Sequence, residues 1–316
     1  MDTMLKIFEL SYPENMTIDG DEQYSLAIGF FDGLHKGHQA VIHQAIEKAK
    51  ELSISSAVMT FTPHPSHVLG GGKNKIGYIT PLDEKSRLLK EMGVDAVFIV
   101  KFDMNLASLK PSEFVDLFIK SLGVKHVTAG FDYTFGAKGA GTMKDMKELS
   151  AGAYETTVVG KVTDSADKIS STRIRKLFSE GNVKDAALLL GRNFRTIGTV
   201  VHGEKNGRKL GFPTANVSPL EGSILPENGV YAVRFLLDGV LLDGVCNVGV
   251  KPTFNNPNIK AAIVEVHLFD FDGDIYGKEV VVEWVEHIRE EKKFESFDAL
   301  IAQIDQDKKT AIEILS

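Results

Sequence analysis

The chain has 316 residues, a net charge of −7 at neutral pH, and 43% hydrophobic and 25% charged residues. This length fits two domains, and the composition is that of an ordinary globular protein. The negative net charge argues against nonspecific nucleic-acid binding as the main activity. The only cysteine, Cys246, cannot form a disulfide within the chain, which fits a reducing compartment. No apolar run approaches the ~20 residues of a membrane helix, so we expect a cytoplasmic protein without a membrane partner.

The first half of the chain alternates strand and helix patterns. An apolar strand at 26–28 precedes a helix in which apolar residues from Val41 to Leu52 keep a helical spacing. Further strands are expected at 56–61, 95–101, 124–129 and 154–159, and further helices from about residue 80, at 112–122 and at 142–150. This alternation predicts a doubly wound α/β fold, a parallel sheet covered by helices on both faces. Such folds bind ligands beyond the carboxyl ends of the strands.

The turn between the first strand and the first helix reads Gly-Phe-Phe-Asp-Gly-Leu-His-Lys-Gly-His-Gln at 29–39. A helix start offers unpaired N–H groups and a partial positive charge, which suit a phosphate. His35 and His38 are three residues apart, so both rings can reach the same anion, and Gly37 lets the backbone approach closely. The turn predicts attack on a nucleoside triphosphate, with the imidazoles stabilising charge on the phosphate.

Two plainer explanations of the histidine pair are weaker. Two surface histidines near a helix start are common, but their place after a strand and before a helix favours a phosphate site. A zinc site needs three or four ligands. His64 and His67 are the only nearby candidates, and Pro63 and Pro65 around them favour a rigid turn.

A second motif reads Ile-Ser-Ser-Thr-Arg-Ile-Arg at 169–175. Ser171 or Thr172 can cap the helix that follows, which is the plain explanation. The guanidinium groups of Arg173 and Arg175 also match phosphate oxygens. The two arginines point about 200° apart on a helix, so we expect one of them to face the site and favour Arg175. In the same half as the histidine turn, Arg175 is predicted to be a second clamp on one triphosphate.

After two short helices at 171–179 and 183–190, the pattern changes. Strands are expected at 196–201, 229–237, 240–248, 261–269 and 279–285, followed by a helix at about 296–315 with Phe297, Leu300, Ile301 and Ile304 on one face. Asp-Gly turns between some of the strands indicate an antiparallel barrel or sandwich. Cys246 lies in an apolar stretch and is expected to be a buried packing residue. We place the boundary near residue 185, giving domains 1–185 and 186–316.

The second half opens with a glycine-rich stretch at 203–216 that ends in Pro-Thr-Ala-Asn. It is not a Walker A loop, because Gly-Lys-Ser/Thr is missing. A long hairpin connection with turn glycines is the plain explanation. Against it, Thr214 and Asn216 offer a hydroxyl and an amide two residues apart, and both can face a magnesium ion or a phosphate.

The strand at 261–269 supplies Glu265, a candidate base for an acceptor hydroxyl. Glu265 alternates with Val264 and Val266, so it points to the face opposite theirs. If the two valines pack in a core, Glu265 faces outward. If the barrel interior is the ligand site, Glu265 points into it. Sequence periodicity does not decide between these two arrangements.

Together these stretches resemble the prokaryotic bifunctional riboflavin kinase/FAD synthetase family over essentially the whole chain. The stretches that carry the resemblance are Gly-Phe-Phe-Asp-Gly-Leu-His-Lys-Gly-His (29–38), Thr-Phe-Thr-Pro-His-Pro (60–65), Gly-Phe-Asp-Tyr-Thr-Phe-Gly (130–136), Ile-Ser-Ser-Thr-Arg-Ile-Arg (169–175), Gly-Arg-Lys-Leu-Gly-Phe-Pro-Thr-Ala-Asn (207–216) and the strand and turn at 265–277. The histidine turn alone marks only the wider nucleotidyltransferase superfamily. The Pro-Thr-Ala-Asn segment and the Glu265 strand are far more specific to riboflavin kinases.

The resemblance implies two reactions. A C-terminal antiparallel β-barrel with a terminal helix would phosphorylate riboflavin with ATP to FMN, and the N-terminal domain would adenylylate FMN with a second ATP, giving FAD and pyrophosphate. Mg²⁺ is the implied cofactor and ATP the co-substrate. By carry-over, the adenylyltransferase ATP site comprises Gly29, Phe30, His35, Gly37, His38, Ser171, Thr172 and Arg175. The kinase ATP and phosphate site comprises Gly203, Gly207, Lys209, Thr214 and Asn216, with Thr214 and Asn216 also on magnesium and Glu265 as the base on the ribityl hydroxyl.

Candidate flavin contacts under this resemblance are Phe61, Asp132, Phe135 and Arg289. An ordinary core role stays open for at least one of the two phenylalanines, and other family members can carry Asn at the position of Asp132. The expected partners are riboflavin, FMN, FAD and ATP, with no nucleic acid, and the chain is expected to be a monomer or a weak homo-oligomer. The alternatives are a monofunctional FAD synthetase with a structural kinase-like domain, another cytidylyl- or adenylyltransferase, and a non-catalytic flavin sensor.

Overall fold

The chain forms two compact units. The computed structural model describes residues 4–18, 20–70, 77–165, 167–203, 212–253 and 256–316. The first unit holds residues 1–78 and 82–170, and the second holds residues 79–81 and 171–316. Each unit has its own sheet and its own core.

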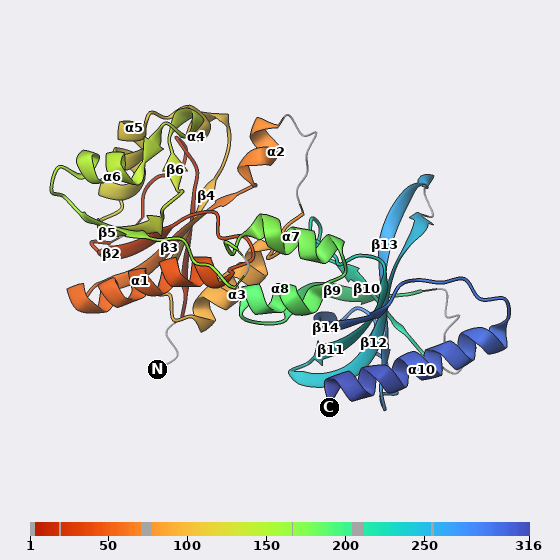
Figure 1. The fold of residues 1–316 in the computed structure, drawn as a ribbon. Coiled ribbons are helices and arrows are strands. Elements are labelled where there is room, and N and C mark those ends of the chain that lie inside the picture. The colour runs from red at the N-terminus through yellow and green to blue at the C-terminus, as the bar shows by residue number, and fades with distance from the viewer. Residues whose placement is uncertain (1–3, 19, 71–76, 166, 204–211, 254–255) are drawn as a thin grey trace. The chain divides into compact units, whose positions relative to one another are not determined.

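A six-stranded parallel sheet forms the first unit, with the order β1-β4-β3-β2-β5-β8 (Figure 1). Its strands are β1 (Lys6–Leu10), β2 (Tyr24–Ile28), β3 (Ser55–Thr62), β4 (Ala96–Lys101), β5 (Val124–Gly130) and β8 (Glu155–Val159). Of these, β1 was not predicted. On one side of β2 lie β3 and then β4, which follow it in the chain, whereas β5 lies on the other side of β2. The strand order therefore changes direction between β2 and β5, and open α/β sheets bind ligands at such a switch point.

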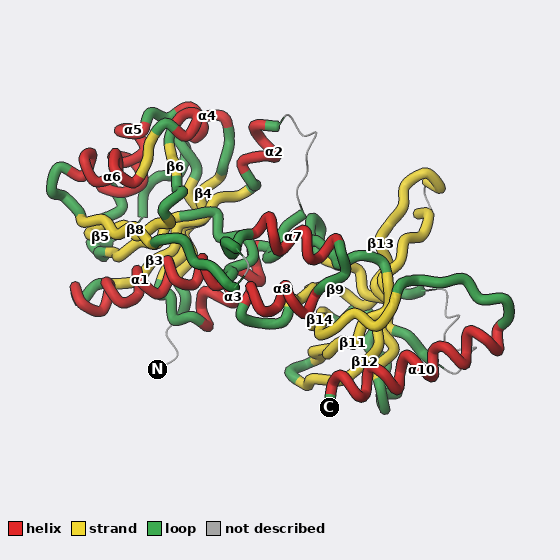
Figure 2. Tube along the Cα trace, viewed as in Figure 1, coloured by secondary structure: helices red, strands yellow, loops and turns green. Residues whose placement is uncertain are grey.

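Helices cover both faces of this sheet, which confirms the doubly wound prediction (Figures 1 and 2). α1 (Lys36–Leu52) and α3 (Leu82–Glu91) pack on the face to which Ala27 and Val58 point. The other face, to which Leu26 and Met59 point, is covered by α4 (Met104–Ser108), α5 (Pro111–Val115), a π-helix (Asp116–Lys120) and α6 (Met143–Ser150). Because helices cover both faces, the inner strands β2, β3, β4 and β5 are largely buried, whereas the edge strands β1 and β8 are more exposed.

The local structure follows the predicted periodicities with a few differences. In α1, Val41, Ile42, Ala45, Ile46 and Ala49 are buried, and only Leu52 of the predicted stripe is exposed. The expected helix at 112–122 is α5 continued by the π-helix, in which Phe118 and Ile119 face the core. The remaining short elements are α2 (Pro65–Leu69), β6 (Thr134–Phe135), a 3₁₀ turn (Ala137–Gly139) and β7 (Gly141–Thr142).

The second unit is a closed antiparallel barrel with the order β10-β13-β12-β11-β14-β9, so the barrel and not the sandwich is the fold. Its strands are β9 (Phe194–Val201), β10 (Ala215–Pro219), β11 (Gly229–Leu237), β12 (Val240–Thr253), β13 (Asn256–Leu268) and β14 (Glu279–Arg289). The sequence pattern missed β10, which is short and ends in Pro219. Among the described residues of this unit, the helices are α7 (Ser171–Ser179), α8 (Val183–Leu190) and α10 (Phe297–Leu315).

Large side chains fill the barrel interior. Tyr231, Trp284 and Cys246 are fully buried there, and the ring of Tyr231 meets the indole edge to face at 5.3 Å. Burial raises the pKa of the Cys246 thiol well above its ordinary value, followed in size by the effect of the nearby Glu265 charge. Cys246 is therefore a protonated packing residue, as predicted.

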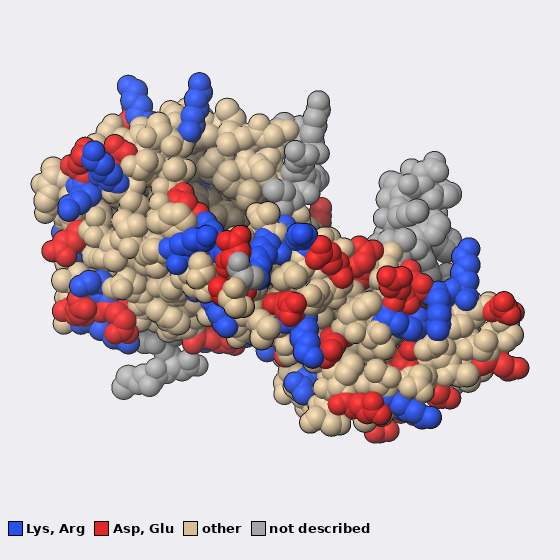
Figure 3. Space-filling view, in the orientation of Figure 1, with Lys and Arg blue, Asp and Glu red and all other residues tan. Residues whose placement is uncertain are grey.

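The helix α10 packs on the outside of the barrel through its C-terminal half (Figure 1). Ala311 and Leu315 are buried against Val230, Ala232 and Val245. Phe297, which we expected on the apolar face, is 74% exposed, whereas the buried residues of α10 lie further along the helix. Figure 3 shows basic and acidic side chains interspersed over the visible face, in keeping with the modest net charge.

We predict that Thr196→Val destabilises the barrel. The Trp284 Nε1–H donates to the Thr196 Oγ1 at 2.9 Å, and both side chains are buried. Valine keeps the shape but leaves the indole N–H unpaired, which costs about 1–3 kcal/mol. Trp284 is the only tryptophan, so its fluorescence during urea unfolding reports this unit. Thr199→Val, an exposed site on the same strand, is the matched control, and equal stability of the two variants would contradict the prediction.

Candidate functional site

The first candidate site is the turn that follows β2 at the switch point of the parallel sheet. The Gly29 N–H donates to the Met59 carbonyl on β3 at 3.1 Å, and the chain then leaves the sheet. Phe31 and Leu34 adopt left-handed backbone angles, with φ of 54° and 43°. Each costs on the order of 1 kcal/mol. The buried side chains of both residues hold the turn in this strained conformation, a feature that clusters at functional sites.

His35 and His38 are brought together at the start of α1. His35 is the N-cap of the helix, and its Nδ1 accepts a hydrogen bond from the His38 backbone N–H at 3.2 Å. In the neutral ring this leaves the proton on Nε2. The two imidazoles are stacked with centroids 3.5 Å apart, and the ring of Phe31 meets that of His38 edge to face at 5.4 Å. The two predicted histidines therefore form a stacked pair at the N-terminus of α1.

The environment of His38 disfavours the imidazolium. Burial lowers the pKa of His38 well below its ordinary value of 6.5, and the positive charges of His35, Lys85 and Lys168 lower it further. Its Nδ1 is buried without a hydrogen-bond partner among the described residues. A buried polar atom left unpaired costs free energy, so a ligand atom that pairs with this nitrogen would be favoured.

Gly37 allows the His35 ring to fold over the first helical turn. A Cβ at position 37 would lie 3.1 Å from Cε1 and 3.2 Å from Nδ1 of His35. These contacts are tighter than an ordinary side chain makes. The glycine predicted to admit a phosphate thus has a second role, because it makes room for the imidazole.

Lys85 was missed by the sequence analysis and lies beneath the turn. Its Nζ donates to the Phe30 carbonyl at 2.8 Å and to the Thr60 Oγ1 at 3.1 Å, and it lies 4.7 Å from the centroid of the Phe30 ring. The helical spacing in the sequence could have revealed it, because Lys85 lies on the same buried face of α3 as Leu88 and Leu89. A charged residue on a buried helix face indicates a polar partner in the core.

Phe30 also joins a cluster with the two histidines that were weighed as zinc ligands. The rings of Phe30 and His64 meet edge to face with centroids 4.3 Å apart, and the centroids of the His67 and Tyr78 rings are 5.6 Å apart. The backbone N–H of His64 donates to the Tyr78 hydroxyl at 3.0 Å. Within the described ranges, no three His, Cys, Asp or Glu side chains are grouped to hold a metal ion.

The candidate flavin contacts of the first unit differ in accessibility. Phe61 is half-buried near Phe102, with ring centroids 6.4 Å apart. Asp132 is exposed and forms an ion pair with Lys168. Phe135 is 5% exposed and packs against Phe114, with ring centroids 5.4 Å apart. The Phe135 ring is part of the core, whereas Phe61 and Asp132 retain access to solvent.

The second predicted clamp begins a helix of the other unit. Ser171 is the first residue of α7, and Thr172 and Arg175 follow in its first two turns. Thr172 is exposed, and Arg175 is half-buried. All three residues thus stand on one short helix whose buried residues are Ile174 and Phe178.

The second candidate site lies on the outer wall of the barrel. Val264 and Val266 are buried in the interior. Glu265 alternates with them and therefore points out of the barrel, which answers the question that the sequence left open. Glu265 is directly opposite Asn216 of β10 on one side and Asn247 of β12 on the other. Residues directly opposite in antiparallel strands have Cβ atoms about 4.5–5.5 Å apart. One carboxylate is thus flanked by two amides, and the sequence analysis missed Asn247 because only the register of β12 against β13 reveals it.

Gly203 fits closely against the Asn216 amide. A Cβ at position 203 would lie 2.3 Å from the Asn216 Nδ2 and 2.7 Å from its Oδ1. Thr214 precedes β10 and is half-buried. The predicted kinase residues Gly207 and Lys209 lie outside the described residues.

Arg289 is engaged by the terminal helix. Its Nε donates to the Asp307 Oδ1 at 2.9 Å, and its Nη2 donates to Oδ2 at 2.6 Å. Asp307 is nearly fully buried and also accepts from Gln303 at 2.8 Å. The guanidinium predicted to line a flavin entrance therefore fastens α10 to the end of β14.

Comparison with known proteins gives consistent results for both halves. A family model described as FAD synthetase matches residues 18–173, and one described as riboflavin kinase matches residues 190–315. A bifunctional riboflavin kinase/FMN adenylyltransferase of Bacillus subtilis is 42% identical and covers 99% of each chain, and one of Escherichia coli K12 is 38% identical and covers 95% of each.

A crystal structure described as a macrolide-efflux protein from Streptococcus pneumoniae is also similar. It has a TM-score of 0.88 and 36% identity, and the match covers 96% of this chain and 98% of that one.

In the part of the chain that the structure describes, no helix combines the length and apolar character needed to cross a membrane.

We expect the His38 ring to titrate well below pH 6.5, because burial and three neighbouring positive charges oppose its protonation. The histidine Cε1–H signals in an NMR pH titration measure this, with His38→Gln identifying the signal. The exposed His43, on the same helix, supplies the comparison signal. A His38 midpoint at or above 6.5 would refute the argument from burial.

Proposed function

The chain belongs to the bifunctional riboflavin kinase/FMN adenylyltransferase family, and from this premise we propose how its residues divide two successive reactions. It transfers the γ-phosphoryl group of ATP to riboflavin, giving FMN and ADP. It then joins FMN to the adenylyl group of a second ATP, giving FAD and pyrophosphate. The observation that carries the division is that His35 and His38 stand on a switch-point turn of the parallel sheet, whereas Asn216 and Glu265 stand on the wall of the barrel.

In the kinase reaction the nucleophile is a neutral alcohol, so a base is useful. Glu265 takes the proton of the ribityl hydroxyl as the oxygen attacks the γ-phosphorus. Its position opposite Asn216 supports this role, because the predicted phosphate-binding residue and the base then face the same surface. The close fit of Gly203 on the Asn216 amide supports a fixed orientation for that amide.

Thr214 and Asn216 would hold the magnesium ion with their hydroxyl and amide oxygens. The donor set fits, because magnesium prefers oxygen ligands and usually shares them with substrate phosphates. When bound, the ion would neutralise charge on the ATP phosphates.

In the adenylyl transfer the nucleophile is the phosphate of FMN, which is already an anion and needs no base. An FMN phosphate oxygen attacks the α-phosphorus of ATP, and the bond to the pyrophosphate oxygen breaks. His35 and His38 bind the ATP phosphates at the N-terminus of α1, where the helix dipole favours anions. The unpaired His38 Nδ1 supports this, because a phosphate oxygen would satisfy it. Ser171, Thr172 and Arg175 are proposed, from their motif alone, to bind ATP phosphates as well, and Phe61 and Asp132 are proposed to contact the flavin.

One assay separates this proposal from a monofunctional synthetase and from a flavin sensor. The protein is incubated with riboflavin, ATP and magnesium, and the flavins are separated by chromatography. FMN and FAD are both expected. FAD formation from supplied FMN without turnover of riboflavin would favour the monofunctional alternative, and no ATP consumption would favour a sensor. Size-exclusion chromatography tests the expected monomer or weak homo-oligomer.

We predict that Glu265→Gln lowers FMN formation by about 10²–10⁴-fold, the usual contribution of a general base. FAD formation from supplied FMN should be unchanged, because that reaction needs no base. Glu279→Gln, an exposed site in the same barrel, is the matched control. Unchanged riboflavin turnover in the Glu265 variant would remove the base assignment.

We predict the opposite pattern for His38→Ala. FMN should accumulate without FAD, with FAD formation reduced by about 10²–10³-fold, the usual effect of removing one well-placed donor to a developing charge. His43→Ala on the exposed side of α1 serves as the control. Normal FAD output from the His38 variant would refute the assignment of the histidine turn.

A further inference from the structure

We propose that Lys85 is a positioning residue of the adenylyltransferase site, which fixes the Phe30 carbonyl at the start of the histidine turn and adds positive charge beside His38. The inference rests on the proposed role of that turn in binding ATP. Nothing in the histidine motif marks this lysine, which lies some 50 residues further along the chain on α3.

The first step is the contact geometry. The Lys85 ammonium donates to the Phe30 carbonyl at 2.8 Å and to the Thr60 Oγ1 at 3.1 Å. The Thr60 hydroxyl donates to the same carbonyl at 2.9 Å. Three elements, α3, β3 and the turn after β2, therefore meet at one carbonyl oxygen. The ammonium also lies over the Phe30 ring, which adds a cation–π contact.

The second step is that a purely structural role would not require a charge here. Lys85 is 3% exposed, and a buried ammonium is costly unless it is paired and hydrogen-bonded. Replacing a buried charged group by a well-packed apolar one is often neutral or stabilising. A lysine at this place is better explained by a need for its hydrogen bonds and its charge.

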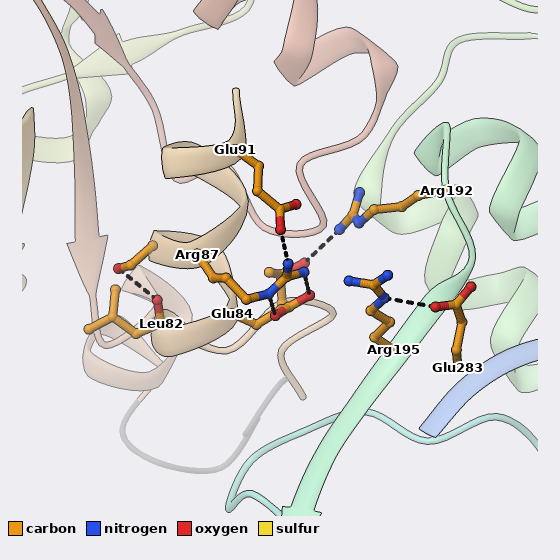
Figure 4. A network of polar contacts seen from close by, with 9 residues as sticks. Leu82, Glu84, Arg87, Glu91, Arg192, Arg195 and Glu283 are labelled. Carbon is orange, nitrogen blue, oxygen red and sulfur yellow. Dashed lines mark hydrogen bonds and ion pairs between the residues drawn. The ribbon is translucent and has the colours of Figure 1, made fainter. Parts of the chain in front are cut away.

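The third step is the link from Phe30 to the histidines. Phe30 directly precedes Phe31, one of the two residues held in left-handed conformation, and the ring of Phe31 contacts that of His38. A shift of the Phe30 carbonyl would therefore move the His38 imidazole. Ion pairs also stabilise α3, the helix that carries Lys85. Arg87 pairs with Glu84 through two contacts of 2.6 Å and also pairs with Glu91 (Figure 4).

The fourth step is electrostatic. Lys85 is one of three positive groups, with His35 and Lys168, whose charge acts on His38. Burial lowers the pKa of Lys85 to about 8, and the nearby buried carboxylate of Asp32 acts in the opposite direction. Lys85 therefore carries most of its charge at neutral pH and loses it as the pH rises through about 8. A triphosphate bound at the turn would feel this loss.

The experiment compares Lys85→Met, Lys85→Arg and Lys90→Met in the full-length protein. Lys90 is an exposed lysine on the same helix and is the matched control. Lys85→Met is expected to lower kcat for FAD formation from FMN by roughly 10²-fold, the effect of misplacing a catalytic group by about 1 Å. Lys85→Arg, which keeps the charge, should recover most of this loss. Riboflavin kinase activity in the same samples should be unchanged, which reports the integrity of the second unit.

The pH profile supplies a readout that a merely structural lysine would not move. Wild-type FAD formation should fall as the pH rises through about 8, whereas Lys85→Arg should keep its activity at higher pH because a guanidinium stays charged. The kinase reaction, measured over the same range, corrects for effects on ATP and magnesium. An alkaline limb that is the same in both proteins would overturn the inference, even if Lys85→Met failed to fold.

The same series separates failure of this inference from failure of the proposed function. If His38→Ala abolishes FAD formation while Lys85→Met behaves like Lys90→Met, only the role of Lys85 is overturned. If His38→Ala retains full FAD formation, the histidine turn itself is misassigned, and the inference for Lys85 falls with it.

Discussion

Both sites lie where they do because successive side chains of a strand point to opposite faces. In the first unit helices cover both faces of the sheet with apolar side chains, and the histidine turn lies beyond the carboxyl end of β2. In the second unit the barrel interior is filled by residues such as Tyr231 and Trp284, which leaves only the outer wall for Glu265. The same alternation of side chains thus places one candidate site at the end of a strand in the first unit and the other on the outer wall of the barrel in the second unit.

The turn after β2 retains several energetically unfavourable features. Phe31 and Leu34 have left-handed backbone angles, the His38 Nδ1 is buried without a described partner, and the Lys85 ammonium lies in the core. Each of these costs stability, and packing around the turn offsets the cost. The barrel wall differs, because Asn216, Glu265 and Asn247 follow ordinary cross-strand register. The first site depends on strain held by packing, and the second depends on regular pairing.

The chemistry of the two reactions explains why the sites carry different residues. An alcohol must lose a proton to attack a phosphorus atom, so the carboxylate of Glu265 suits the role of base that we propose for it. A phosphate is already an anion, so the adenylyl transfer depends on positioning and on stabilising charge, for which imidazoles, a helix N-terminus and a buried ammonium are suited. Arg289, the candidate flavin contact of the second unit, also binds Asp307 of α10.

The sequence by itself determined the fold class, the family and the histidine turn, because helical and strand periodicities and short motifs are local signals. It missed β10, whose five residues end in Pro219. It also left the direction of Glu265 open, since alternation with Val264 and Val266 is the same whether the ligand lies inside or outside the barrel. Tertiary structure decided that direction by filling the interior. It also decided that Phe135 belongs to the core, that Asn247 stands beside Glu265, and that Lys85 reaches Phe30, because contacts between residues far apart in the chain depend on how the elements pack.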